Sequence, residues 1–108
     1  MERRVSPRVP LDAPFFVTVC LESGERHSAM LVDCGRGGAQ LAFSLAEGLL
    51  ASLISQKLMI LNLPKGLRIY RDSCSGVVTW VSPQRCGVRF DHLLPLTDDE
   101  VMAVANSL

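Results

Sequence analysis

Two neighbouring stretches in which apolar and polar residues alternate constrain the fold of this chain most. In "FFVTVCLE" at 15–22, every second residue from Phe15 to Leu21 is apolar, as in a strand with one buried face. "SGE" at 23–25 is a short turn, and "RHSAMLVDC" at 26–34 is the returning strand. "GRGG" at 35–38 ends that strand, and "AQLAF" at 39–43 starts another. The sequence therefore predicts a β-hairpin followed by a third strand.

The rest of the chain continues in short β-like runs. "KLMILNLP" at 57–64 is a strand that Pro64 and Gly66 end. We predict a long strand over 67–82 that bends near Gly76, and a last strand in "CGVRFDHL" at 86–93, with the turn between them at 83–84. Residues 44–55 contain helix formers but also a central glycine, and we interpret them as a connection with at most one helical turn.

The C-terminal segment predicts a short amphipathic helix. Thr97 and Glu100 have the spacing of a capping box, in which each side chain accepts the other residue's backbone N–H. Leu96 and Val101 stand at the positions of a hydrophobic staple. An apolar stripe continues along one face of the helix, which indicates packing against the rest of the domain.

These elements predict an all-β fold: a small antiparallel β-barrel of six to seven strands with a C-terminal α-helix. At 108 residues the chain is one domain. The first dozen residues lack apolar periodicity, so we expect a flexible N-terminal arm. The predicted boundaries are 1–13 for the basic arm, 14–94 for the barrel and 95–108 for the helix.

Charge and cysteine usage exclude several classes of protein. Eleven basic residues balance eleven acidic ones, so no bulk positive field would hold long nucleic acid or an anionic membrane. The longest apolar region, 41–54, is shorter than a membrane-spanning helix. The four cysteines form no C-x-x-C pair, so we expect free thiols and neither a metal site nor a disulfide. We expect a cytoplasmic protein with no membrane insertion.

Three arginines, Arg3, Arg4 and Arg8, stand within the first eight residues, and Arg4 and Arg8 form R-x-x-x-R. Downstream, "DCGRGG" at 33–38 is D-x-G-x-x-G at a predicted strand end. This ordered pair, with "GVVTW" and "CGVRF" further on, resembles the PilZ domain family over nearly the whole chain. Members of that family are bacterial receptors for the second messenger cyclic di-GMP, and their signature is R-x-x-x-R followed by [D/N]-x-S-x-x-G.

The resemblance implies a binding site made of Arg3, Arg4, Arg8, Asp33, Gly35 and Gly38. Arginine matches the O6/N7 edge of guanine or a phosphate bidentately, and a carboxylate at Asp33 would accept the guanine N–H donors. Gly35 replaces the serine of the motif, so we expect binding weakened by about three- to a hundredfold through one lost hydrogen bond. The resemblance also implies that the residue just before R-x-x-x-R influences the number of ligands bound. An arginine there, Arg3, could stack on or pair with a second guanine, so we expect two ligand molecules per domain.

The resemblance implies a non-catalytic receptor that switches a surface for an unidentified downstream protein, with no cofactor. The alternative is a degenerate adaptor of the same family that binds nucleotide weakly or not at all. A third interpretation, a barrel for single-stranded nucleic acid, is opposed by the neutral net charge and by few aromatic residues. We expect no enzyme, because no nucleophile–base pair, P-loop or pair of histidines has a recognisable context. Trp80 and Phe90 alternate with valines, which favours core positions for both.

Overall fold

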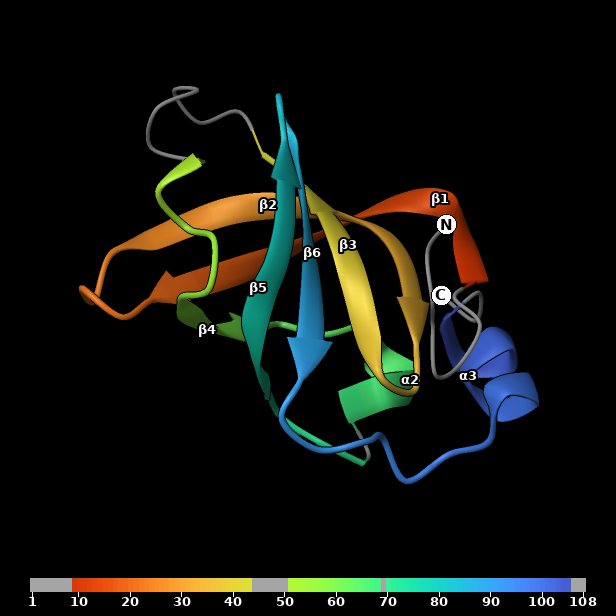
Figure 1. Ribbon diagram of the computed structural model, residues 1–108. Helices are drawn as coiled ribbons and strands as arrows, with labels where there is room; N and C mark the ends of the chain where they lie inside the picture. Colours follow the sequence, from red (N-terminus) through yellow and green to blue (C-terminus); the bar gives the residue numbers. More distant parts are fainter. Residues whose placement is uncertain (1–8, 44–50, 69, 106–108) are drawn as a thin grey trace.

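The computed structural model describes residues 9–43, 51–68 and 70–105, which form a closed antiparallel β-barrel of six strands (Figure 1). The strands are β1 (Val9–Leu21), β2 (Arg26–Gly35), β3 (Gly38–Ala42), β4 (Lys57–Leu61), β5 (Cys74–Ser82) and β6 (Arg85–Phe90). Around the barrel their order is β1-β2-β3-β6-β5-β4, and β4 pairs with β1 to close it. The predicted all-β barrel is confirmed, with six strands among the described residues.

The core consists of the inward-facing residues of all six strands together with buried residues of the helices and the connecting segments. Alternate positions of β1, such as Val17 and Val19, are buried, and Leu41 and Val88 meet them from β3 and β6. Burial of this kind contributes roughly 1.5–3 kcal/mol for each large aliphatic side chain. A closed barrel also leaves no unpaired sheet edge.

A β-bulge in β2 decides which way Asp33 faces. Ala29 and Leu31 are buried, and strict alternation would send Asp33 into the core after them. The register instead shifts between Leu31 and Asp33, so that Asp33 lies opposite Gln40 of β3. Cys34, which is 2% exposed, takes the inward position. The bulge thus places the carboxylate of Asp33 on the outer face.

A second register shift, in β5, turns Trp80 in the same direction. The shift lies between Val78 and Trp80. Val78 is a core residue, whereas Trp80 is half-buried and lies opposite Gly87 of β6. Our prediction of a core position for Trp80 was therefore wrong, and the one for Phe90, which is 7% exposed, is confirmed.

Two predicted boundaries were also wrong. β1 begins at Val9, so the barrel starts before the predicted boundary at residue 14. The predicted strand over 67–82 is a strand only from Cys74, because Lys65–Arg68 form the short helix α2. The carbonyl of Pro64 accepts hydrogen bonds from the N–H groups of Leu67 and Arg68, and this turn buries Leu67 in the core. Tertiary burial of one leucine has overridden the β-like local pattern.

The predicted C-terminal helix is present as α3 (Asp98–Ala105), which packs against α2, β1 and β2. The capping box is confirmed: the N–H of Thr97 donates to Glu100 Oε1 at 2.9 Å, and the N–H of Glu100 donates to Thr97 Oγ1 at 3.2 Å. The helix starts at Asp98 rather than at residue 95, because Thr97 is the cap. Residues 106–108 lie outside the described residues.

The predicted connection at 44–55 is described only from residue 51, which is helical, and residues 52–55 form a turn. Across the described part of the chain, no helix has the length and apolar character needed to cross a membrane.

Candidate functional site

The D-x-G-x-x-G motif forms the β2–β3 hairpin. Gly35 ends β2 and Gly38 begins β3, and the two residues lie opposite each other. Arg36 and Gly37 make the turn between them. Asp33 stands two positions before the end of β2, on the outer face. The structure thus brings three of the predicted site residues, Asp33, Gly35 and Gly38, together at one end of one hairpin.

The start of β1 lies beside this hairpin. Val9 is the Cα partner of Cys34, and Pro10 is the Cα partner of Asp33. Arg3, Arg4 and Arg8 lie outside the described residues. Arg8 is bonded to Val9, and consecutive Cα atoms are only about 3.8 Å apart. The R-x-x-x-R motif therefore joins the barrel directly next to the D-x-G-x-x-G motif, although the two are far apart in the sequence.

Asp33 begins a chain of polar side chains across three strands. The residue is only 9% exposed, and its Oδ2 accepts a hydrogen bond from Gln40 Nε2 at 3.3 Å. The Oε1 atom of Gln40 in turn accepts a hydrogen bond from Arg85 Nη1 at 2.9 Å. A carboxylate, an amide and a guanidinium are thus linked across β2, β3 and β6.

Trp80 of β5 lies on the same outer face, and Gly87 of β6 separates it from Gln40. Gly87 pairs with Gln40 on one side and with Trp80 on the other. A Cβ atom at Gly87 would overlap the indole ring of Trp80, at Nε1, Cε2 and Cδ1. The indole therefore lies directly over the backbone of Gly87. Aromatic rings that cover a strand glycine in this way are known to stabilise sheets.

The hairpin turn is tied to the segment that leads into α3. The carbonyl of Gly37 accepts a hydrogen bond from the N–H of Phe90 at 2.9 Å, and the carbonyl of Arg36 accepts one from the N–H of Leu94 at 2.7 Å. Phe90 and Leu94 are both buried. The carbonyl groups of the turn are thus hydrogen-bonded to two buried residues. A displacement of the turn would therefore also displace the segment that leads into α3.

No disulfide joins any of the four cysteines, all of which lie among the described residues. Cys34, Cys74 and Cys86 are buried, whereas Cys20 is half-buried. Desolvation by burial raises the pKa of Cys86 to about 12, and it raises the pKa of Cys74, with the charge of Arg71 opposing it. These two thiols are therefore protonated at neutral pH and offer no nucleophile.

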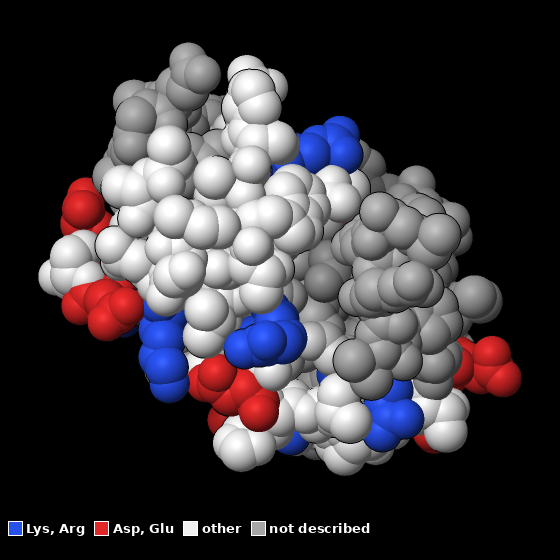
Figure 2. Space-filling model, viewed as in Figure 1, with Lys and Arg blue, Asp and Glu red and all other residues white. Residues whose placement is uncertain are grey.

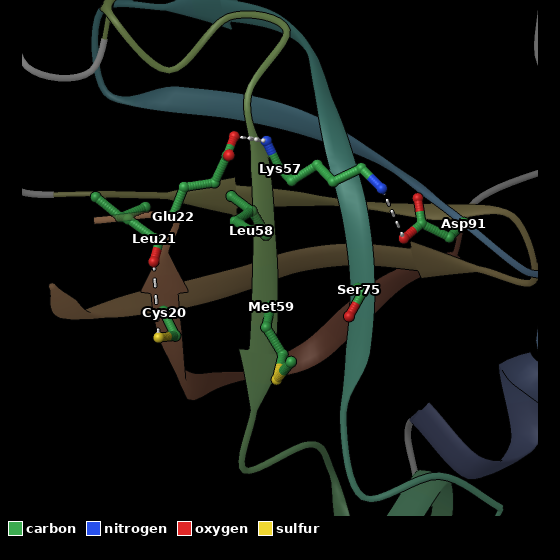
Figure 3. A pocket seen from close by; sticks show the side chains of 8 residues that line it. All are labelled: Cys20, Leu21, Glu22, Lys57, Leu58, Met59, Ser75 and Asp91. Atoms are coloured by element: carbon green, nitrogen blue, oxygen red, sulfur yellow. Dashed lines mark hydrogen bonds and ion pairs between the residues drawn. The ribbon is translucent and has the colours of Figure 1, made fainter. Parts of the chain in front are cut away.

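A hollow on the other side of the barrel, of about 280 Å³, does not extend the site (Figure 3). It lies over β1, β4 and β5, and Lys57 crosses it to within 4.0 Å of Asp91 Oδ2. Glu22 Oε1 accepts the backbone N–H of Lys57 at 2.9 Å. Its charged groups are engaged with each other or with the backbone, so the hollow indicates no class of ligand.

Sequence reasoning missed Gln40, which contacts Asp33, as well as Arg85 and Trp80, which lie further along the same outer face. A signal existed for Trp80, because a two-residue turn at Pro83–Gln84 pairs residue 82 with 85 and hence Trp80 with Gly87. No comparable signal existed for Gln40, since its position opposite Asp33 depends on the bulge in β2.

Comparison with known proteins identifies the fold and the family. The chain is similar in structure to MrkH of K. pneumonia, solved as a complex with c-di-GMP, with a TM-score of 0.59 and 18% sequence identity. The similarity covers 94% of this chain and 49% of the MrkH chain, so this chain spans about half the length of that protein. No protein of curated function matches it in sequence. The family model described as "PilZ domain" matches residues 2–103, and the chain belongs to the PilZ domain family.

Proposed function

We propose that this chain is a non-catalytic receptor for cyclic di-GMP, bound on the outer face of the barrel between the start of β1 and the β2–β3 hairpin. Membership of the PilZ domain family supports this function. The structural similarity to MrkH, which was solved with c-di-GMP, agrees with it at the level of the fold.

The observation that carries the proposal is the register between β1 and β2. Pro10 lies opposite Asp33 and Val9 lies opposite Cys34, so the chain enters the barrel beside the motif hairpin immediately after Arg8. A ligand at Asp33 would therefore be within reach of a basic arm attached next to it. Arg4 and Arg8 would hold guanine and phosphate, and Arg3 would pair with a second, stacked ligand molecule.

The chemistry of the described residues suits a guanine dinucleotide. A carboxylate accepts the N1–H and N2–H donors of guanine, and Asp33 is the buried carboxylate of the hairpin. Gly35 and Gly38 present backbone without side chains beside it. Arg89, an exposed residue of β6, lies opposite Gly38 and adds a cation at the edge of the same face. Trp80 offers a ring next to Gly87 on which a base could stack.

Binding would switch a surface for a downstream protein. The ligand would bridge the arm and the hairpin, and ordering each arm residue would cost about 1–2 kcal/mol of its binding energy. The turn of that hairpin is hydrogen-bonded to Phe90 and Leu94. The segment that leads into α3 is thus the part of the described fold that would respond first.

One observation favours the alternative, a PilZ adaptor that binds nucleotide weakly or not at all. Asp33 is 9% exposed and already accepts a hydrogen bond from Gln40. A ligand would have to reach a carboxylate that is partly covered. A role in nucleic-acid binding has less support, because in Figure 2 the basic and acidic side chains of the described residues are scattered over the face in view and form no single basic strip.

Calorimetric titration of the purified protein with cyclic di-GMP, with GTP as the control nucleotide, tests the proposal. We expect saturable binding of cyclic di-GMP at two equivalents per domain and none of GTP at the same concentrations. Arg4→Ala and Arg8→Ala should each abolish binding while circular dichroism shows an intact barrel. Normal binding by both variants would refute the proposed site, and saturation at one equivalent would refute the role of Arg3.

A further inference from the structure

The side chain of Gln40 connects two groups of opposite charge, and nothing in the family signature assigns it a role. Gln40 is half-buried between Asp33, which is buried, and Arg85, which is exposed. Its neighbour on β6 is Gly87, which has no side chain. Arg85, two positions away on β6, therefore reaches Gln40 diagonally across the strand pair.

We propose that Gln40 and Arg85 are a positioning pair that fixes the carboxylate of Asp33 and so sets the selectivity of the site for guanine over adenine. This inference rests on the proposed function. It adds two residues outside the motif whose effect on the ligand is transmitted through Asp33.

Only one orientation of the Gln40 amide satisfies both neighbours. A guanidinium has N–H donors and no acceptor, so the amide oxygen must face Arg85. The NH₂ group then faces Asp33 and donates to Oδ2. Arg85 thus prevents the amide from flipping, and the amide in turn restrains rotation of the carboxylate. Neighbours of this kind hold a binding group in its productive geometry.

The orientation of Asp33 decides between the two bases. Guanine presents two adjacent donors, N1–H and N2–H, to a carboxylate, whereas adenine presents an acceptor at N1 beside its one amino donor. A carboxylate in a fixed plane accepts both guanine donors and meets the lone pair of adenine N1. A carboxylate that can rotate accepts the two guanine donors less well. It also avoids part of the repulsion from the lone pair of adenine N1. Removing Gln40 should therefore reduce selectivity as well as affinity.

The test compares cyclic di-GMP with cyclic di-AMP on four variants of the whole chain. Gln40→Met keeps the length of the side chain without its hydrogen bonds, and we expect its affinity for cyclic di-GMP to fall about tenfold. We expect the ratio of the two affinities to fall with it. Arg85→Met should act in the same direction, and the double variant should bind no more weakly than Gln40→Met, because Arg85 acts through Gln40. Gln40→Glu should bind most weakly, because it sets a second carboxylate beside Asp33.

Two matched controls separate these effects from those of removing any exposed amide or any exposed positive charge. Gln56 and Arg26 are exposed and have no hydrogen bond or ion pair with Asp33, Gln40 or Arg85 among the described residues. Gln56→Met and Arg26→Met should leave affinity and selectivity unchanged. Additive losses in the double variant would show that Arg85 contacts the ligand itself and would overturn the inference, as would unchanged selectivity in Gln40→Met.

A measurement without ligand keeps the inference separate from the proposed function. In the ligand-free protein, the side-chain amide resonances of Gln40 should shift on Arg85→Met and on Asp33→Asn, and not on Arg26→Met. If these shifts are absent, the positioning pair does not exist. If the shifts occur but the wild-type protein does not bind cyclic di-GMP, the proposed function fails and the selectivity role fails with it.

Discussion

Pro10 of β1 lies opposite Asp33 of β2, so the residue that follows the basic N-terminal motif by two positions is paired with the acidic residue of the strand-end motif. Strand pairing is enforced by the backbone and by the burial of the neighbouring core residues. The pairing of Pro10 with Asp33 is therefore a consequence of the barrel and needs no bound nucleotide. It fixes the point at which the N-terminal motif is attached, beside the hairpin half of the proposed cyclic di-GMP site.

Replacement of Gly35 by serine should strengthen binding. Gly35 is not among the described residues with positive φ, so a side chain at this position causes no backbone strain. A serine hydroxyl would restore the hydrogen bond that the family motif supplies, and we expect affinity for cyclic di-GMP to rise about three- to a hundredfold. Calorimetric titration of Gly35→Ser beside the wild type gives the ratio, and an equal or weaker affinity would contradict the expectation.

Replacement of Gly87 by alanine should displace Trp80. The new Cβ atom would overlap the indole ring, so the ring must leave the strand surface. Because Trp80 is the single tryptophan of the chain, its fluorescence reports this directly, and we expect emission at longer wavelength as the ring enters water. Ser75→Ala, on the same strand, is the control and should leave the spectrum unchanged. An unchanged spectrum in Gly87→Ala would show that the ring does not lie over Gly87.

Replacement of Gly66 by alanine should destabilise the contact between α2 and α3. A Cβ atom at Gly66 would stand 2.8 Å from Val104 Cβ and 3.1 Å from the carbonyl oxygen of Val104. Overpacking of this kind typically costs about 1–3 kcal/mol, so the midpoint of urea unfolding should fall. Lys65→Ala, in the same helix and exposed, should change it little. A midpoint that does not move in Gly66→Ala would mean that α3 is free to shift.

The cysteines should differ in their reactivity towards alkylating reagents. Burial raises the pKa of Cys86 to about 12, so almost none of this thiol is ionised at pH 8. Burial also raises the pKa of Cys74. Cys20 is the half-buried thiol and should be labelled first by iodoacetamide. Mass spectrometry of the folded protein measures the order, and early labelling of Cys86 would contradict the described core.

The sequence predicted the barrel because its strands have one buried face and alternate accordingly, as Val17 and Val19 do. It also predicted the capping of α3, because the capping box between Thr97 and Glu100 is local. The early start of β1 could not be predicted, since the strand at Val9 exists through its pairing with β2 and not through its own apolar pattern.

The candidate site was predictable only as far as its motifs. Asp33, Gly35 and Gly38 were predicted from the D-x-G-x-x-G motif. Their position on one hairpin followed from the glycines that end β2. The outward position of Asp33 was not predictable, because it depends on a bulge that alternation does not reveal. The link from Asp33 through Gln40 to Arg85 depends on the same bulge and on the register of β6.

The most direct test of the account is a titration of the ¹⁵N-labelled protein with cyclic di-GMP, followed by NMR. The account predicts that amide signals of Asp33, Gly35 and Gly38 move together with those of residues 3–8, with one common ligand dependence. Signals of the hollow near Lys57, on the other side of the barrel, should stay in place. Movement of the hairpin signals without the arm signals, or of neither set, would contradict the claim that both motifs bind the same nucleotide.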